Sequence, residues 1–212
     1  MSNLNAFLGG LNSSMFIDEV TEALNSDGIP RRTYQGYEYG SLVNGDGIRT
    51  VVWFSGCVHH CKGCHNPDTW NPKSGKVTLE DMLSDIAKSM QDEFVSGITL
   101  SGGDPCHPMN IYEATVLSEA IKKYFPEKTI WVYTGYKWEE LIEPCHNIDE
   151  YMFTDIEMRR IYGRRFLKNI DVLVDGKFNQ DLADINYPWA GSTNQRVINV
   201  KESLKNDIII LH

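Results

Sequence analysis

Short apolar runs and longer amphipathic segments alternate along most of this chain. Runs of strand length occupy residues 50–54, 97–100, 129–133, 170–174 and 196–200, and residues 207–211 are expected to add a sixth strand or a closing edge. Helical spacing of apolar positions is found in segments 78–94, 110–125, 137–142 and 155–168. Repeated strand-helix units predict right-handed βαβ connections and therefore a parallel sheet.

The number of strands predicts an incomplete barrel. A complete eight-fold β/α barrel takes about 250 residues, whereas this chain has 212. Five or six strands therefore favour an α/β fold of the partial TIM-type barrel kind, with parallel strands. We expect residues 37–212 to form this domain.

Two local patterns set expectations for the helix over 78–94. Thr78 and Asp81 form a pair that resembles a capping box, which places the helix start directly after Thr78. Apolar residues recur at helical spacing from Leu79 to Phe94, so this whole series is expected to form one buried face.

Residues 1–36 differ from the rest of the chain. Phe16, Val20 and Leu24 predict a short amphipathic helix, and the polar, Gly- and Pro-containing residues 25–30 end it. We interpret residues 1–36 as an N-terminal extension. It is either a terminal arm packed on the domain or a segment that docks a partner and orders on binding.

Three cysteines occur within the eight residues 57–64, CVHHCKGC, directly after the first predicted strand. An iron–sulfur cubane held by protein alone normally takes four thiolates, so three would leave one iron open to a substrate. The alternative is a structural zinc site in a non-catalytic binding module. Zinc would need a fourth ligand from a nearby histidine, namely His59, His60 or His65.

Unusual residues follow each of the first four predicted strands. They are the cysteine loop, then Gly102, Gly103 and Asp104, then Thr134 and Tyr136, then Asp175 and Lys177. Because active sites of parallel sheets and barrels lie at the carboxyl ends of the strands, we expect one site along this edge. The glycines would let a ligand approach the main chain, and the Asp104 carboxylate could accept hydrogen bonds from an ammonium group. Trp53 and Trp131 lie within strands and are expected in the core.

Composition narrows the class of protein. A formal charge of −9 argues against nucleic acid as a partner. The absence of a membrane-length apolar run and of a signal-type N-terminus predicts a cytoplasmic protein without a membrane partner. Five cysteines form no disulfide framework and indicate metal or thiol chemistry. The two outside the loop, Cys106 and Cys145, are expected to be inert thiols.

Four segments together resemble a known family. The cysteine spacing and the Gly-Gly-Asp strand end are similar to the radical S-adenosylmethionine enzymes. The closer resemblance, over residues 37–200, is to the activating proteins of anaerobic ribonucleoside-triphosphate reductase. It is carried by VNGDGIR (43–49), FSGCVHHCKGC (54–64), SGGDP (101–105) and GSTNQR (191–196).

The resemblance implies a radical S-adenosylmethionine core with a [4Fe–4S] cluster on Cys57, Cys61 and Cys64, and S-adenosylmethionine on the fourth iron. It further implies that Gly63, Cys64 and His65 line the cofactor and that Gly103 meets its methionyl end. Gly102, Asp104, Thr134 and Tyr136 are additional candidate contacts. The implied reaction cleaves the cofactor reductively and forms a glycyl radical on another protein.

The implied partners are the large subunit of the anaerobic reductase and a one-electron donor such as flavodoxin or ferredoxin; the resemblance also allows a homodimer. The sequence around His65 is equally similar to the pyruvate formate-lyase activating enzyme, which is the alternative target class. Gly63 and Asp104 depart from that sister enzyme, which tends to carry an aromatic residue and Glu at these positions.

Overall fold

In the computed structural model, one six-stranded sheet organises a mixed α/β fold. The structure describes residues 2–26, 28–29, 31–143 and 155–212. The strands lie side by side in the order of the sequence: β1 (Tyr34–Ser41), β2 (Ile48–Phe54), β3 (Val95–Gly102), β4 (Thr129–Tyr133), β5 (Val172–Asp175) and β6 (Arg196–Asn199).

The two edges of the sheet correct the prediction of an all-parallel arrangement. β2, β3, β4 and β5 are parallel, but β1 is antiparallel to β2 and β6 is antiparallel to β5. β1 was not predicted as a strand. The short turn before β2 explains its direction, because Gly45 and Gly47 have positive φ angles and an antiparallel pair can be joined by a tight turn, whereas a parallel pair cannot.

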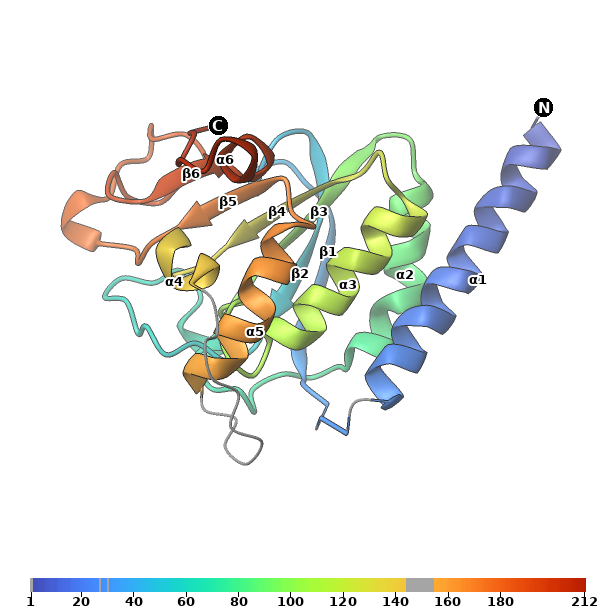
Figure 1. Ribbon diagram of the computed structural model, residues 1–212, viewed down its shortest axis with the longest axis horizontal. Helices are drawn as coiled ribbons and strands as arrows, with labels where there is room; N and C mark the ends of the chain where they lie inside the picture. Colours follow the sequence, from blue (N-terminus) through green and yellow to red (C-terminus); the bar gives the residue numbers. More distant parts are fainter. Residues whose placement is uncertain (1, 27, 30, 144–154) are drawn as a thin grey trace.

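Helices cover one face of the sheet (Figure 1). α2 (Leu79–Gln91), α3 (Ile111–Tyr124) and α5 (Asp155–Leu167) supply apolar side chains to the main core, as their periodicity predicts. α1 (Ser2–Ser26) lies outside α2 and α3. Shorter segments complete the fold: η1 (Pro67–Thr69), α4 (Trp138–Ile142), η2 (Gln180–Leu182) and α6 (Val200–Asn206).

α2 begins where its capping pattern predicts. The Thr78 side chain accepts from the Asp81 backbone N–H, and the Asp81 carboxylate accepts from the Thr78 backbone N–H at 2.8 Å. Its buried face runs from Leu79 to Met90. The prediction that this face continues to Phe94 is wrong, because the helix ends at Gln91 and Phe94 is exposed.

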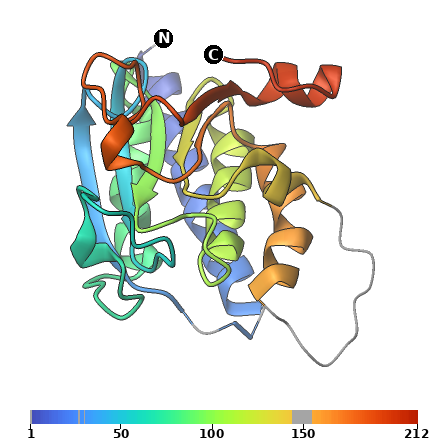
Figure 2. The ribbon, with the colours of Figure 1, turned by 90° about the vertical axis from the view of Figure 1, so that its left-hand side faces the viewer.

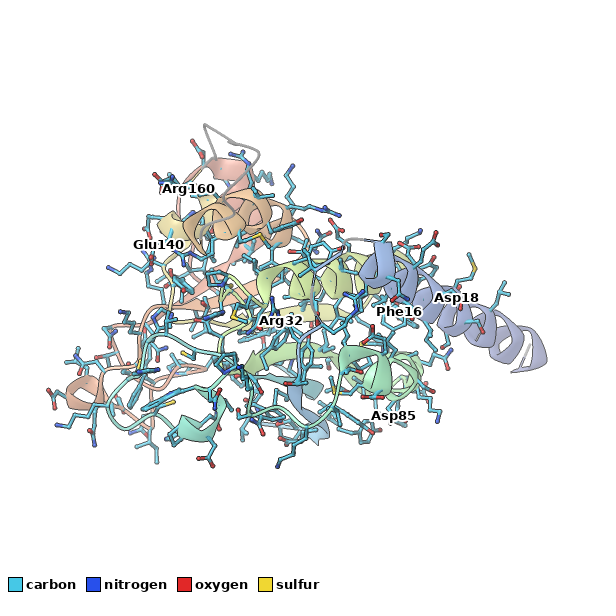
Figure 3. All side chains as sticks on the ribbon, turned by 90° about the horizontal axis from the view of Figure 1, so that it is seen from below. Phe16, Asp18, Arg32, Asp85, Glu140 and Arg160 are labelled. Carbon is cyan, nitrogen blue, oxygen red and sulfur yellow. The ribbon has the colours of Figure 1, made fainter. Side chains whose placement is uncertain are left out.

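α1 packs into the main core through the three apolar residues that the sequence indicated. Phe16, Val20 and Leu24 are fully buried, and the Phe16 ring meets the Phe125 ring edge-on at 5.6 Å. Figure 3 shows Phe16 on the side of α1 that faces the protein, while Asp18 points outward. The helix is longer than its sequence pattern predicted, and its buried residues share one core with residues of β2, β3, β4 and β5.

The opposite face of the sheet carries a smaller apolar cluster. Trp131, Val172 and Val174 are buried there, with Trp189 packed against them. Trp131 is therefore a core residue, as predicted. At the C-terminus the predicted sixth strand is only a single bridge between Leu211 and Ile198, and α6 was not predicted. Among the described residues, no helix combines the length and the apolarity needed to cross a bilayer.

The packing of α1 predicts a stability cost for one substitution. Phe16→Ala should lower the free energy of unfolding by about 3–5 kcal/mol, because it removes a fully buried aromatic ring and leaves a cavity. Denaturant-induced unfolding followed by circular dichroism measures the change. Asp18→Ala on the exposed side of the same helix is the matched control and should stay within about 0.5 kcal/mol. Equal stability of both variants would contradict this packing.

Candidate metal centre

The carboxyl ends of the four parallel strands meet along one edge of the sheet. β4 and β5 point to the left in Figure 1, and in Figure 2 the loop that follows β2 lies at the lower end of that strand. The register aligns Phe54 at the end of β2 with Gly102 at the end of β3. Likewise, Tyr133 at the end of β4 lies opposite Val174 of β5. The four segments predicted to carry chemistry therefore start from neighbouring positions.

The ends of β2 and β3 approach each other closely. Gly103 N–H donates to the Phe54 carbonyl at 2.8 Å, and Asp104 N–H donates to the Gly56 carbonyl at 2.9 Å. A Cβ atom on Gly103 would lie 2.6 Å from the Gly56 carbonyl oxygen, which is too close for any side chain. The two glycines thus hold the Gly-Gly-Asp segment directly against the start of the cysteine loop.

The cysteine loop is anchored at its start and folded by local contacts. Cys57 N–H donates to the Trp70 carbonyl at 3.1 Å, and Cys64 N–H donates to the Cys61 carbonyl at 3.1 Å. His60 adopts a positive φ of 46°, and its ring stacks on Trp70 at 4.7 Å. These contacts fix the conformation of the eight-residue loop.

The three loop thiols influence one another. Burial raises the pKa of Cys57 to about 12, with further upward contributions from the negative charges of Asp104 and Cys61. Burial also raises the pKa of Cys61, and the charge of Cys64 adds to this effect. Negative charge on one loop thiolate therefore disfavours ionisation of its neighbours. A bound cation would reverse it, because metal ions bind thiolates and displace their protons.

The donor set fits an iron–sulfur cluster. Cys57, Cys61 and Cys64 are free thiols, and soft thiolates are the ligands that iron–sulfur clusters take. Asn66 N–H lies 3.4 Å from the Cys64 sulfur, and the Phe178 backbone counteracts the effect of burial on the pKa of Cys61. N–H groups aimed at sulfur atoms are a usual feature around clusters, since they stabilise the negative charge of the ligands.

A zinc site fits less well. Within the described chain, one group of His, Cys and acidic side chains brings its ligand atoms within 4.8 Å of one another, namely Cys57, His59 and Asp104. It contains one of the three thiols instead of the predicted Cys3His set. His60 is stacked on Trp70, and His65 lies near the Phe178 ring at 6.2 Å. No histidine joins the three cysteines in this part of the structure.

An open cavity of about 630 Å³ adjoins the cysteine loop. Gly63, Cys64 and His65 line it, and their contact with a cofactor stays a prediction. Gly102, Gly103, Asp104, Thr134 and Tyr136 are not among its lining residues. The first two press against the end of β2, while Asp104, Thr134 and Tyr136 are buried.

Several cavity residues escaped the sequence analysis. Trp53 was expected in the core, but it is partly exposed and lines the cavity. Phe178 belongs to the segment after β5, whose predicted rim residue Lys177 is exposed. Residues 185–195 form a long irregular segment with no periodic signal, and several of them close one side of the cavity: Ile185, Tyr187, Trp189, Ala190, Gly191 and Gln195.

Asp104 lies at the centre of a buried hydrogen-bond cluster. Its carboxylate accepts from the Thr134 hydroxyl at 2.7 Å and lies 2.9 Å from Nε2 of His59. The Tyr136 ring meets the His59 ring at 4.5 Å. The structure therefore joins three predicted site residues to a histidine of the cysteine loop that was predicted only as a polar loop residue.

The remaining candidates have structural partners. Asp175 accepts from Trp138 N–H at 2.7 Å and pairs with Arg196, so it ties α4 to β6. Cys106 is fully buried, and burial raises the pKa of its thiol well above the usual value, as expected for an inert residue. Cys145 lies outside the described residues.

Comparison with known proteins identifies the family. Residues 43–198 match the family described as "4Fe-4S single cluster domain". The anaerobic ribonucleoside-triphosphate reductase-activating protein of Escherichia coli (strain K12) is 40% identical over 166 residues, 77% of this chain and 96% of that protein. The proteins of the same name from Enterobacteria phage T4 and Haemophilus influenzae are each 37% identical, over 74% and 76% of this chain and 86% and 94% of their own length. The chain therefore belongs to the family of anaerobic ribonucleoside-triphosphate reductase-activating proteins and carries its 4Fe–4S domain.

Proposed function

We propose that this chain activates an anaerobic ribonucleoside-triphosphate reductase by forming a glycyl radical on its large subunit. The observation that carries the proposal is the three-thiol loop beside an open cavity at the carboxyl edge of the sheet. Three thiolates leave one iron of a cubane open to a small molecule, and the cavity provides space for that molecule. The relatives named above act on the anaerobic reductase, which favours this target over pyruvate formate-lyase.

Cys57, Cys61 and Cys64 would hold the [4Fe–4S] cluster, and S-adenosylmethionine would occupy the adjoining cavity. When both are bound, one-electron cleavage of the sulfonium group supplies a carbon radical that can remove a hydrogen atom from a glycine. Every other task belongs to the protein, which binds, orients and shields the reacting groups.

The chain's own residues suit these tasks in different ways. Gly63 and His65 line the cavity next to Cys64, where they would contact the cofactor directly. Trp53 and Phe178 bring apolar surface to the same cavity and would exclude water. Gly103 would bring its main chain near the methionyl group because it has no side chain. Contacts of Gly102, Thr134 and Tyr136 with the cofactor stay predictions.

We also propose that the sheet forms an incomplete barrel around the cavity. Glu38, Trp53, Ser101 and Tyr133 come from four consecutive strands, β1 to β4, and all of them line the same cavity. Side chains on one face of a flat sheet project parallel to one another. A cavity shared by side chains of four strands therefore supports curvature of the strands around it.

The division of the chain is part of the proposal. Residues 37–212 would form the catalytic domain, since the family match covers 43–198. Residues 1–36 would be an extension whose helix α1 stabilises the domain through α2 and α3. A one-electron donor such as flavodoxin or ferredoxin would supply the electron, and a homodimer is one assembly that the resemblance allows.

The cluster assignment predicts the behaviour of Cys57→Ala. The anaerobically reconstituted wild-type protein should hold about four irons per chain and produce 5′-deoxyadenosine with dithionite. The variant should lose the cluster and at least about 99% of this activity, because one of three ligands is gone. Iron analysis and product chromatography measure both quantities. Undiminished turnover of Cys57→Ala would refute the assignment.

The target is tested by electron paramagnetic resonance on candidate partners. The wild-type protein should generate a glycyl radical on the anaerobic reductase large subunit and none on pyruvate formate-lyase. A glycyl radical on pyruvate formate-lyase and none on the reductase would show that pyruvate formate-lyase is the target. Radical formation on neither protein, with 5′-deoxyadenosine still produced, would contradict both targets and leave the cluster chemistry standing.

The close approach at Gly103 predicts a second effect. Gly103→Ala should lower cluster retention and activity about 10-fold or more, because the new Cβ would meet the Gly56 carbonyl and displace the cysteine loop. Iron content per folded chain measures the change. Gly10→Ala, in a helix with nothing within 4 Å of the added atom, is the matched control and should retain full iron content. Wild-type iron content in Gly103→Ala would contradict the steric argument.

A further inference from the structure

His59 lies between two of the three cysteines, yet its side chain is buried. Only 5% of the side chain is exposed, although the loop around it lies at the protein surface. Nε2 lies 2.9 Å from Oδ2 of Asp104, and the ring packs edge-on against Tyr136 with 4.5 Å between centroids. A Cβ atom on Gly135 would come within 2.2 Å of the His59 ring. Asp104, Gly135 and Tyr136 therefore form a socket that His59 fills completely.

The Asp104 carboxylate has four hydrogen-bond donors. Oδ1 accepts from the Thr134 hydroxyl at 2.7 Å and from Cys106 N–H at 2.8 Å. Oδ2 accepts from Gly135 N–H at 3.0 Å and faces His59 Nε2. A carboxylate has about four acceptor positions, and the contacts with Thr134, Cys106, Gly135 and His59 occupy them. With 1% of its surface exposed, Asp104 has no acceptor position left for a ligand.

The sequence suggested that the Asp104 carboxylate accepts hydrogen bonds from an ammonium group, but its acceptor positions are already occupied. An ammonium group of a bound cofactor would have to displace one of four internal donors from a buried carboxylate. A buried donor left unpaired is destabilising, so the displacement is unfavourable. The His59 socket, by contrast, uses the carboxylate in its observed geometry.

We propose that Asp104 is a positioning residue for the cysteine loop and acts through His59, instead of binding the ammonium group of the cofactor. The proposal rests on the proposed function, since it concerns the cluster held by Cys57, Cys61 and Cys64. The ligand atoms of Cys57, His59 and Asp104 lie within 4.8 Å of one another. By holding the His59 side chain, the socket also holds the chain that follows Cys57 in place, including the backbone amides of His59 and His60.

The position of the amides has a consequence for the cluster. An N–H group that donates to a cluster ligand stabilises the more negative, reduced cluster, so hydrogen bonds to sulfur set the reduction potential. Release of His59 from its socket would loosen these amides together with the chain between Cys57 and Cys61. Asp104 therefore influences both the retention of iron and the potential, although no cluster ligand comes from it.

Three variants test the proposal in the full-length, anaerobically reconstituted protein. Asp104→Asn removes the charge, His59→Phe keeps a ring in the socket without a donor, and the double variant combines them. Each single variant should lose iron to a chelator about 10-fold faster and shift the reduction potential to a lower value. The double variant should be no worse than either single one, because both substitutions break the same contact. Redox titration followed by electron paramagnetic resonance measures the potential.

Affinity for S-adenosylmethionine separates the two roles of Asp104. This affinity, measured by equilibrium dialysis on the oxidised cluster that does not cleave the cofactor, should change less than about 3-fold per cluster in Asp104→Asn. If Asp104→Asn lost affinity for S-adenosylmethionine but kept wild-type iron retention and reduction potential, the proposal would be overturned. Asp104 would then be a cofactor-binding residue. Additive effects in the double variant would also overturn the proposal.

Asp175→Asn controls for a merely structural effect. Asp175 is an equally buried carboxylate at the end of β5, but its partners are Trp138 and Arg196 instead of the cysteine loop. The Asp175→Asn variant should lower the melting temperature and leave the reduction potential of the cluster unchanged. The same shift in potential as in Asp104→Asn would refute the positioning role.

Cys57→Ala in the same series tests the proposed function separately. If Cys57→Ala abolishes the cluster while Asp104→Asn and His59→Phe keep wild-type iron retention and reduction potential, only the socket inference fails.

Discussion

The site depends on the contact between the main chains at the ends of β2 and β3. Gly103 and Gly56 lie so close that no side chain fits between them, and two backbone hydrogen bonds seal the contact. Parallel neighbours in register make this approach possible, because both strands end at the same height. The cysteine loop and the Gly-Gly-Asp segment consequently start from one fixed point. The contact between Gly56 and Gly103 therefore sets the position of the loop residues that line the cavity, Gly63 and Cys64.

Buried polar groups secure the strands at both ends of the sheet. At the site edge Asp104 and Asp175 each bind groups from neighbouring segments. Near the opposite edge, Arg49 is fully buried, and its five hydrogen bonds go to Asp46, Ile98, Thr99 and Thr129. Burial lowers the pKa of Arg49 to about 10. All five hydrogen bonds go to neutral oxygens, which are backbone carbonyls and threonine hydroxyls. Buried ions need such complete pairing, which ties β2, β3 and β4 into one rigid unit.

The arrangement separates stability from chemistry. Helices and the main core occupy one face of the sheet, and α1 adds its apolar residues to that face through Phe16, Val20 and Leu24. The cavity is on the other side of the strands, where Trp53 and Tyr133 line it. The long segment after β5 forms part of its wall without regular structure. Such a segment can differ in shape between relatives, since it contributes little to the core.

The sequence by itself determined the chemistry and most of the elements. The Thr78 cap and the periodicity of α2 and α3 are local properties, which explains why these predictions hold. Tertiary structure decided what depends on distant partners: the antiparallel edges, the exposure of Phe94 and Trp53, and the wall formed by residues 185–195. It also joined His59 to Asp104 across 45 positions of sequence. No local pattern encodes that pairing, because it exists only when parallel strands bring their ends together.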